Sequence, residues 1–254
     1  MKITAIIPTF NEEIHIEEAI QSVSFADEII VIDSFSTDAT VALAKKHNVK
    51  ILQRVFDDFS SQKNYAIDVA KHEWVYVLDA DERVSIELKD EILNINLEAT
   101  NFVGFYVKRV FFFLDKKINF SGWQRDKVMR LFNKKHCRYN GAPVHELIDA
   151  KGVASFFKGK VNHYSYRDYD HYISKLNAYS LLQAKNLHQQ NKKVNAFHLF
   201  IKPPVRFLIH YIIRLGFLDG KAGVVIAKTQ AYAVSKRYEL LKELNKKKTK
   251  EVSL

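Results

Sequence analysis

An apolar run ends abruptly in two carboxylates at residues 74–82, which read WVYVLDADE. The β-branched and aromatic residues of this run predict a buried strand at 74–78. In an open α/β sheet, ligands bind beyond the carboxyl ends of the strands. Asp79 and Asp81 at such an end would be hard oxygen ligands for a divalent cation, and such a cation commonly holds a phosphate. An isolated Asp-x-Asp is explained equally well by a solvated turn or a helix N-cap, so the surrounding sequence has to decide.

Strand and helix patterns alternate through the first third of the chain. The expected strands are residues 3–8, 28–33, 50–55 and 74–78. The expected helices begin at Asn11, at Ser36 or Asp38, and at Ser60 or Ser61, whose side chains can cap a first turn. Short links between alternating strands and helices predict a mostly parallel sheet with helices on both faces.

The pattern changes after residue 96. Further strands are expected at 102–113, 127–132 and 153–161, a helix at 168–190, and a long helical tail after Pro203 and Pro204. We therefore expect an α/β body with a C-terminal helical extension, divided at 1–98, 99–195 and 196–254.

Composition excludes several classes of protein. With 47% hydrophobic and 13% aromatic residues, the chain is expected to form a folded core. A single cysteine, Cys137, excludes an internal disulfide and a cysteine-based zinc site and favours a reducing compartment. The first residues do not form a basic and apolar leader, and no uncharged apolar run reaches the roughly 18 residues of a membrane span. Neither secretion nor a spanning helix is therefore expected.

Polar side chains follow three of the expected strands, and parallel strands would bring them to one edge of the sheet. They are Thr9, Asn11 and Glu12 after the first strand, Asp33, Ser34 and Asp38 after the second, and Asp79 and Asp81 after the fourth. Helix capping explains Asn11 and Asp38 as well, whereas Asp33 and Asp79 each end an apolar strand directly.

Three segments stand in order along this part of the chain: residues 6–13 (IIPTFNEE), 30–38 (IVIDSFSTD) and 77–82 (VLDADE). Together they resemble the signatures of family 2 glycosyltransferases, which have the GT-A fold. More weakly, residues 143–146 (PVHE) and 216–220 (GFLDG) resemble a branch that adds sugars to the lipopolysaccharide core, including its β-glucosyltransferases. The resemblance implies a Rossmann-like, nucleotide-sugar-binding half at 1–98 and an acceptor-binding half at 99–195.

The resemblance implies an inverting transfer of a sugar from a UDP-sugar such as UDP-glucose, with Mg²⁺ or Mn²⁺ as cofactor. The cation would be bound by Asp81 and Asp79. The nucleotide sugar would be bound by Pro8, Thr9, Asn11, Glu12, Asp33, Ser34, Lys63, Asp79 and Ala80, although a solvated helix face explains Lys63 as well. Ser34 and Phe35 stand where the family commonly has a second acid and a glycine, which leaves the base of the donor less constrained.

The chemistry requires a cation and a base. Breaking the sugar–phosphate bond leaves a diphosphate, whose developing charge a cation stabilises, and the acceptor hydroxyl must lose a proton to a carboxylate. We assign this base to Glu146, with His145 orienting it or contacting phosphate; Asp126 and Asp149 are rivals, and a surface acid on a turn is the alternative. His163 is a candidate further metal ligand and Trp123 a candidate sugar-stacking side chain, with a structural role as the alternative for each.

Residues 196–254 hold 12 basic and 4 acidic residues, a net charge of +8 out of +10 for the chain. Lys202, Arg206, His210 and Arg214 recur at every fourth position between apolar residues, so they line one helical stripe. A basic stripe on an apolar helix is typical of a helix that lies in a bilayer surface. A helix packed on the catalytic domain or on another subunit is the alternative, so a homo-oligomer stays open.

The sequence thus predicts a cytoplasmic enzyme, peripheral on the inner face of the cell membrane, that glycosylates a lipid-linked or lipopolysaccharide-core saccharide. The alternatives are a glycosyltransferase acting on another glycan or a peptide, and a nucleotide-sugar-binding module without catalysis. No nucleic acid partner is expected, because the tail aromatics have helical core spacing and do not form a platform on a sheet.

Overall fold

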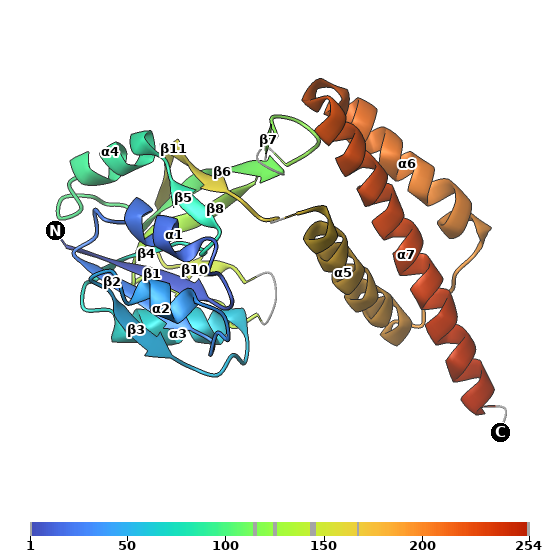
Figure 1. Cartoon of the computed structure of the whole chain (residues 1–254), viewed down its shortest axis with the longest axis horizontal. Coiled ribbons are helices and arrows are strands. Elements are labelled where there is room, and N and C mark those ends of the chain that lie inside the picture. Colours follow the sequence, from blue (N-terminus) through green and yellow to red (C-terminus); the bar gives the residue numbers. More distant parts are fainter. Residues whose placement is uncertain (1, 114–115, 124–125, 143–145, 167, 253–254) are drawn as a thin grey trace. The chain divides into compact units, whose positions relative to one another are not determined.

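The computed structural model of the chain describes residues 2–113, 116–123, 126–142, 146–166 and 168–252, with residues 171 and 247–252 described by their backbone only. It divides into two compact units (Figure 1). The α/β unit is Met1–Val110 with Arg125–His163, and the helical unit is Phe111–Gln124 with Tyr164–Leu254. These boundaries differ from the expected divisions at 98 and 195. Helix α5 (Tyr169–Gln189) packs along α7 (Lys221–Val252) and so belongs with the tail.

One large mixed sheet forms the α/β unit. Its first four strands in spatial order are parallel: β3 (Lys50–Gln53), β2 (Glu28–Asp33), β1 (Ile3–Thr9) and β4 (Trp74–Val77). The strands that follow are β8 (Lys127–Asn133), β6 (Gly104–Phe113), β11 (Ala154–His163) and β5 (Glu82–Val84), with β8 antiparallel to both β4 and β6. The short strand β7 (Lys116–Lys117) pairs with β6, and β9 (Cys137–Tyr139) pairs with β10 (Ile148–Ala150). The α/β class is confirmed, as are the four expected parallel strands.

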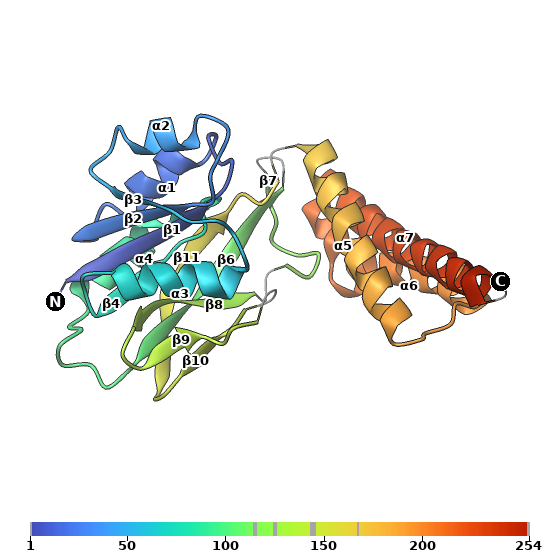
Figure 2. The ribbon, with the colours of Figure 1, turned by 90° about the horizontal axis from the view of Figure 1, so that it is seen from below.

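Helices cover both faces of the sheet, as the alternation predicted (Figure 2). Successive side chains of a strand point to opposite faces, so each central strand contributes to two cores. Ile7 and Tyr76 pack in one core with α1 (Ile16–Ser22), α2 (Thr40–Ala44) and α4 (Ile86–Asn94). Ile6 and Val77 pack in the other core with α3 (Phe59–Val69). Burial on both sides is the reason that these strands appear in the sequence as continuous apolar runs.

The N-terminal caps differ from the expected ones at three helices. Helix α2 begins after Ala39 without a side-chain cap, so the expected cap at Ser36 or Asp38 is wrong; the Asp38 carboxylate instead accepts the Thr40 N–H at 3.0 Å. Helix α3 begins after Asp58, whose carboxylate accepts a hydrogen bond from the Ser61 N–H at 2.8 Å. The expected cap at Ser60 or Ser61 is therefore wrong, because an aspartate two or three residues earlier already satisfies the first turn. Asn11 does not cap α1, since its side-chain oxygen accepts the Thr37 N–H at 2.8 Å and so joins the loops after β1 and β2.

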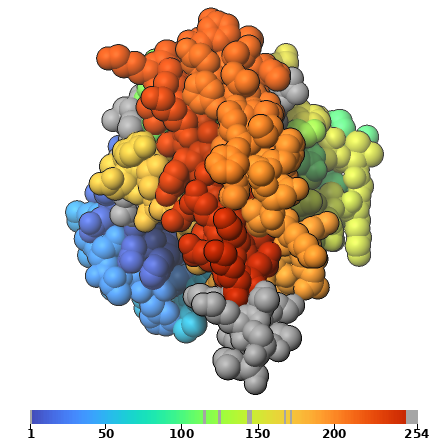
Figure 3. Space-filling model, turned by 90° about the vertical axis from the view of Figure 1, so that its right-hand side faces the viewer, coloured from blue at the N-terminus to red at the C-terminus, as the bar shows by residue number. Residues whose placement is uncertain are grey.

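The helical unit contains α5, α7 and an irregular helix between them. That segment consists of a π turn (η1, Phe197–Ile201), α6 (Lys202–Leu208), a second π turn (η2, Ile209–Ile213) and a 3₁₀ turn (η3, Gly216–Asp219). It runs beside α7 on the face shown in Figure 3. Within the described residues, the helices are too short or too polar to cross a bilayer.

A buried aspartate ties this segment to the loop after β7. The Asp219 carboxylate accepts hydrogen bonds from the backbone N–H groups of Asn119 and Phe120 and from the Ser121 hydroxyl at 2.7 Å. Close helix packing adjoins it, because a Cβ placed on Gly223 would lie 1.7 Å from the Gly216 carbonyl oxygen. Residues 216–220 therefore have a structural role in this unit.

His210 is buried beside the same loop and has a defined tautomer. Its Nδ1 lies 2.9 Å from the Ser121 carbonyl oxygen, so Nδ1–H donates, and its Nε2 lies 3.3 Å from Arg214 Nη1 and accepts. Burial, together with the charges of Arg214 and Arg206, lowers the pKa of His210 to about 4, although the hydrogen bond to Ser121 acts in the opposite direction. The neutral imidazole is therefore the form that fits this site.

We predict that acid weakens the helical unit through His210. An unfolded histidine has a pKa near 6.5, so the unfolded chain binds more protons than the folded chain between about pH 6.5 and 4. Above about pH 6.5 His210 does not change the free energy of unfolding. As the pH decreases from about 6.5 to 4, this free energy falls, with a slope of up to about 1.4 kcal/mol per pH unit. The measurement is denaturant unfolding followed by Trp123 fluorescence in a Trp74→Phe background. His210→Asn keeps a donor toward Ser121 but does not titrate, so its slope should be shallower; an unchanged slope would contradict the prediction.

Candidate active site

The carboxyl ends of β1 and β2 bring the first two motifs together. Thr9 and Asp33 are register partners on these strands, and both are buried. The Asp33 carboxylate accepts hydrogen bonds from the Ser36 backbone and hydroxyl and from Gln53 Nε2 at 3.0 Å. The Thr9 hydroxyl is buried without a hydrogen-bond partner among the described residues. This edge therefore holds one fixed carboxylate and one buried hydroxyl that has no hydrogen-bond partner among the described residues.

Other expected nucleotide-sugar residues lie in β1 and on the loops after β1, β2 and β4. The Ser34 hydroxyl accepts from Gln62 Nε2 at 2.6 Å, and the Glu12 N–H donates to the Thr40 hydroxyl at 2.8 Å. Pro8 is half-buried within β1. The Ala80 carbonyl accepts from Arg83 at 2.9 Å, which fixes the backbone between the two aspartates.

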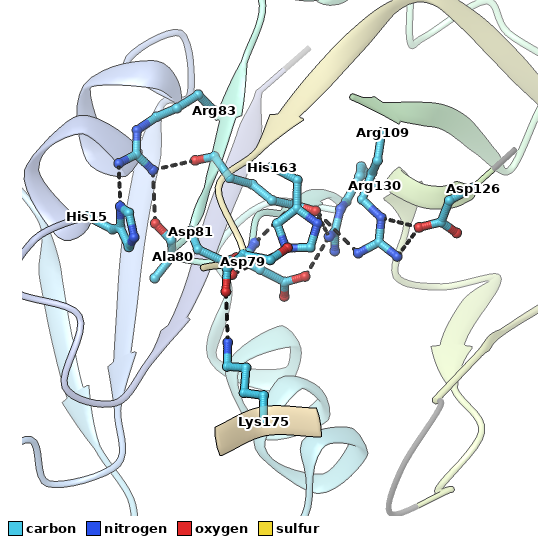
Figure 4. Close-up of polar contacts among 12 residues, drawn as sticks. His15, Asp79, Ala80, Asp81, Arg83, Arg109, Asp126, Arg130, His163 and Lys175 are labelled. Carbon is cyan, nitrogen blue, oxygen red and sulfur yellow. Dashed lines mark hydrogen bonds and ion pairs between the residues drawn. The ribbon is translucent and has the colours of Figure 1, made fainter. Parts of the chain in front are cut away.

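Asp79 faces two cations. Its Oδ2 lies 2.6 Å from Arg130 Nη2, and its Oδ1 lies 3.3 Å from Lys63 Nζ (Figure 4 labels Asp79 and Arg130). Burial would raise the pKa of Asp79, but Arg130 and Lys63 outweigh burial and hold the pKa well below its usual range. Asp79 is therefore a fixed negative charge that protein groups already neutralise.

Arg130 is buried between two carboxylates. Besides Asp79, it binds Glu82 Oε1 at 2.5 Å, and Glu82 is fully buried. Burial opposes its charge, yet Asp79 and Glu82 raise the pKa of Arg130 well above its ordinary value. Sequence reasoning missed Arg130 and Glu82 as site residues. The available signal was a lone arginine inside the apolar strand pattern at 127–132.

Asp81 points to a different partner. Its Oδ2 lies 3.2 Å from His163 Nε2, at the end of β11 (Figure 4). Burial lowers the pKa of His163, but the Asp81 charge and hydrogen bond raise it above its ordinary value. The strand pairing explains the meeting, because His163 is the register partner of Glu82, the residue that follows Asp81.

Asp81 and His163 fit a divalent cation as two of its ligands. They offer one carboxylate oxygen and one imidazole nitrogen, the donors that metal sites use. No group of three or more His, Cys, Asp and Glu side chains that could hold a metal occurs within the part of the chain that is described. The remaining ligands would thus come from a bound phosphate group or water. That Asp79 joins them stays a prediction, since its oxygens face Lys63 and Arg130.

Lys63 joins Asp79 to Glu146. The buried Lys63 ammonium lies 2.6 Å from Glu146 Oε1 and is held on α3. Burial lowers the pKa of Lys63, but Asp79 and Glu146 are among the groups that raise it, and the net shift is upward. The alternative of a solvated helix face for Lys63 is therefore wrong. The alternative of a surface acid on a turn does not describe Glu146 either, because its side chain is 15% exposed and paired with Lys63. His145 lies outside the described residues.

The remaining candidates have different surroundings. Asp126 joins the cluster through Arg109, which pairs with Asp126 and also lies 3.6 Å from Glu82 Oε1 (Figure 4). Asp149 lies apart from it, exposed on β10. Trp123 packs with Phe113 and other aromatic side chains in a core of the helical unit, which is the structural alternative given for it.

Comparison with known proteins places the chain in a family. Residues 4–157 match the sequence model described as "Glycosyl transferase family 2", and these residues contain the edge formed by Thr9, Asp33, Asp79 and Asp81. The chain therefore belongs to glycosyltransferase family 2, whose GT-A type of α/β fold it shares.

Curated relatives extend over nearly the whole chain. An uncharacterized glycosyltransferase of Rickettsia typhi is 32% identical over 258 residues, covering 97% of this chain and 88% of the relative. The lipopolysaccharide core biosynthesis glycosyltransferase LpsC of Rhizobium meliloti is 26% identical over 254 residues, covering 94% of each chain. Among solved structures, glucosyl-3-phosphoglycerate synthase of Mycobacterium tuberculosis with Mn²⁺, UDP and its glucosylated product matches 44% of each chain at 22% identity and a TM-score of 0.36. That partial match does not bear on the chemistry of this site.

We predict that Arg130→Met destabilises the α/β unit by about 3–5 kcal/mol, because it leaves Asp79 and the buried Glu82 without their shared cation. The measurement is denaturant unfolding followed by Trp74 fluorescence in a Trp123→Phe background. Adding Glu82→Gln should recover part of the loss, since it removes a buried charge that would keep only the longer contact to Arg109 at 3.6 Å. Lys135→Met, which breaks the exposed pair with Glu73, serves as the matched control and should cost less than about 1 kcal/mol. Equal effects of the two single variants would contradict the assigned role of Arg130.

Proposed function

We propose that this protein is an inverting glycosyltransferase that moves a sugar from a UDP-sugar, with UDP-glucose as one donor to test, to a lipid-linked or lipopolysaccharide-core saccharide. The observation that carries the proposal is that the Asp81–His163 pair and the Lys63–Asp79–Arg130 cluster meet at the carboxyl edge of the parallel strands, where open α/β sheets bind ligands. The relative LpsC is named for lipopolysaccharide core biosynthesis, which supports this class of acceptor.

The donor is bound along this edge in the proposed arrangement. Thr9, Asp33 and Ser34 lie beside the nucleoside, and the unpartnered Thr9 hydroxyl supports a polar ligand there. Asp81 and His163 would hold Mg²⁺ or Mn²⁺ there. When bound, the cation supplies positive charge that stabilises the departing diphosphate. Lys63 and Arg130 fix the negative charge of Asp79 next to this position.

Glu146 is the proposed base. In its ion pair with Lys63 it is a carboxylate, the form that accepts the proton of an acceptor hydroxyl. Lys63 links it to Asp79, so the base and the donor edge are held by one side chain.

The location that we propose is the inner face of the cell membrane, where a lipid-linked acceptor would be reached.

We predict that Glu146→Gln retains UDP binding and lowers transfer by about 10²-fold or more, because glutamine keeps the shape of the side chain without the basic oxygen. UDP binding is measured by calorimetry, and transfer is measured as UDP release from a panel of UDP-sugars with acceptor present. Asp149→Asn, at the exposed rival position, is the control and should retain transfer. Full turnover by Glu146→Gln would remove the assignment.

The cation has its own prediction. Asp81→Asn should abolish metal-dependent transfer and weaken Mn²⁺ binding in the presence of UDP by roughly tenfold or more, since a charged oxygen ligand is lost. Bound Mn²⁺ is counted by electron paramagnetic resonance, a readout independent of activity. Glu73→Gln removes an exposed carboxylate and should change neither value. Wild-type activity that persists after chelation would contradict the role of the metal.

A further inference from the structure

The irregular helix at 197–213 turns large apolar side chains toward solvent. Its apolar side chains face solvent at Phe200, Ile201, Val205, Leu208, Ile212 and Ile213, and we call these six residues the exposed apolar face. Phe200 is 72% exposed and Ile213 73%. Most of these positions recur three or four residues apart, the spacing of one side of a helix. Exposure of so many large apolar side chains together marks an interaction surface.

The basic stripe lies on the opposite side, against the rest of the helical unit. Lys202 Nζ donates to the Tyr238 hydroxyl on α7 at 2.7 Å, and His210 is buried against Ser121. Arg214 packs so closely on Gly122 that a Cβ there would lie 2.4 Å from Arg214 Cδ. The sequence alone suggested that this stripe would meet anionic lipid. In the structure the basic side chains instead fix the helix to its own unit and leave the apolar side outward.

Charge distinguishes the occupants that could cover this face. Residues 191–228 include one acidic residue, Asp219, and it is buried among backbone N–H groups. Lys192 and Lys193 before the segment and Lys221 after it are exposed. In a dimer with a two-fold axis, these three lysines of one copy would lie close to the same lysines of the other, and their charges would repel. An anionic bilayer would instead attract them, by roughly 1 kcal/mol for each cation near the surface.

We propose that the exposed apolar face inserts into an anionic bilayer, with the helix lying in the plane of the headgroup–acyl boundary. Burial of the apolar face supplies most of the attraction, and the flanking lysines add to it. The inference deepens the proposed membrane location and rests on it, but it does not depend on sugar transfer.

The test is flotation of the full chain, without donor, on vesicles of phosphatidylcholine with phosphatidylglycerol and on vesicles of phosphatidylcholine alone. We expect wild-type protein to float with the mixed vesicles and to retain a weaker fraction on the neutral ones. Phe200→Glu with Ile213→Glu should reduce binding to the mixed vesicles by roughly tenfold or more, because two apolar anchors become charged. The matched control is Ile86→Glu with Val153→Glu, which changes two equally exposed apolar residues of the α/β unit and should bind as wild type.

Circular dichroism, UDP release in solution and the oligomeric state are measured beside the flotation. Circular dichroism and UDP release in solution should be the same for both double variants, so a loss of flotation reflects the surface and not the fold or the chemistry. Absence of UDP release from every protein would remove the proposed transfer and leave the flotation result valid. Unchanged flotation of the Phe200→Glu, Ile213→Glu variant overturns the proposal. A wild-type dimer that this variant converts to monomer, with flotation unchanged, would assign the face to a second copy instead.

Discussion

The ion pairs of Arg130 determine how the site is assembled. Arg130 comes from β8, whereas its two carboxylate partners follow β4 and begin β5. Along the hydrogen-bonded order of the sheet, β5 is the last strand and β4 lies near the middle. In sequence the two are separated by only a few residues, so the sheet must curl until its last strand returns to the end of β4. Arg130 closes this curl by binding both segments at once.

A buried arginine carries a large desolvation penalty, which only well-placed carboxylates can offset. The two carboxylates have the complementary requirement, which Arg130 meets together with Lys63 beside Asp79 and Arg109 at 3.6 Å from Glu82 Oε1, so the groups of this network depend on one another. That mutual dependence orients Asp79, and Lys63 then transmits the orientation to Glu146. Asp81 is outside this arrangement and faces His163, so the two aspartates of one short motif have different partners. The charge that the protein neutralises at Asp79 and the charge that we propose for the cation at Asp81 are thereby separated by one residue.

The sequence predicted those parts of the site that depend on local pattern. Asp33, Asp79 and Asp81 were found because each follows an apolar strand, and parallel strands end at a common edge. The strands themselves were found because burial on both faces produces continuous apolar runs. Arg130 and Glu82 were missed because their role arises from the curl of the sheet, which no local period encodes. The cap of α3 was misplaced for a simpler reason. Residues 57–61 include four polar side chains that can each cap a helix, and the sequence does not show that Asp58 is the one in position.

In the helical tail, the basic stripe predicted from the sequence points into its own unit and not toward solvent. A stripe of cations at every fourth residue is a sound indication of one helical face, but it does not say which way that face points. Here the Lys202 ammonium donates to a hydroxyl, the His210 imidazole to a carbonyl and the Arg214 guanidinium to a ring nitrogen, all inside the unit. The glycines of the 216–223 region allow the close approach that this requires. Three of the 12 basic residues at 196–254, Lys202, Arg206 and Arg214, are consequently half-buried against their own unit. Salt should therefore weaken attachment to an anionic surface less than a net charge of +8 suggests, because screening acts on the exposed lysines and leaves apolar burial in place.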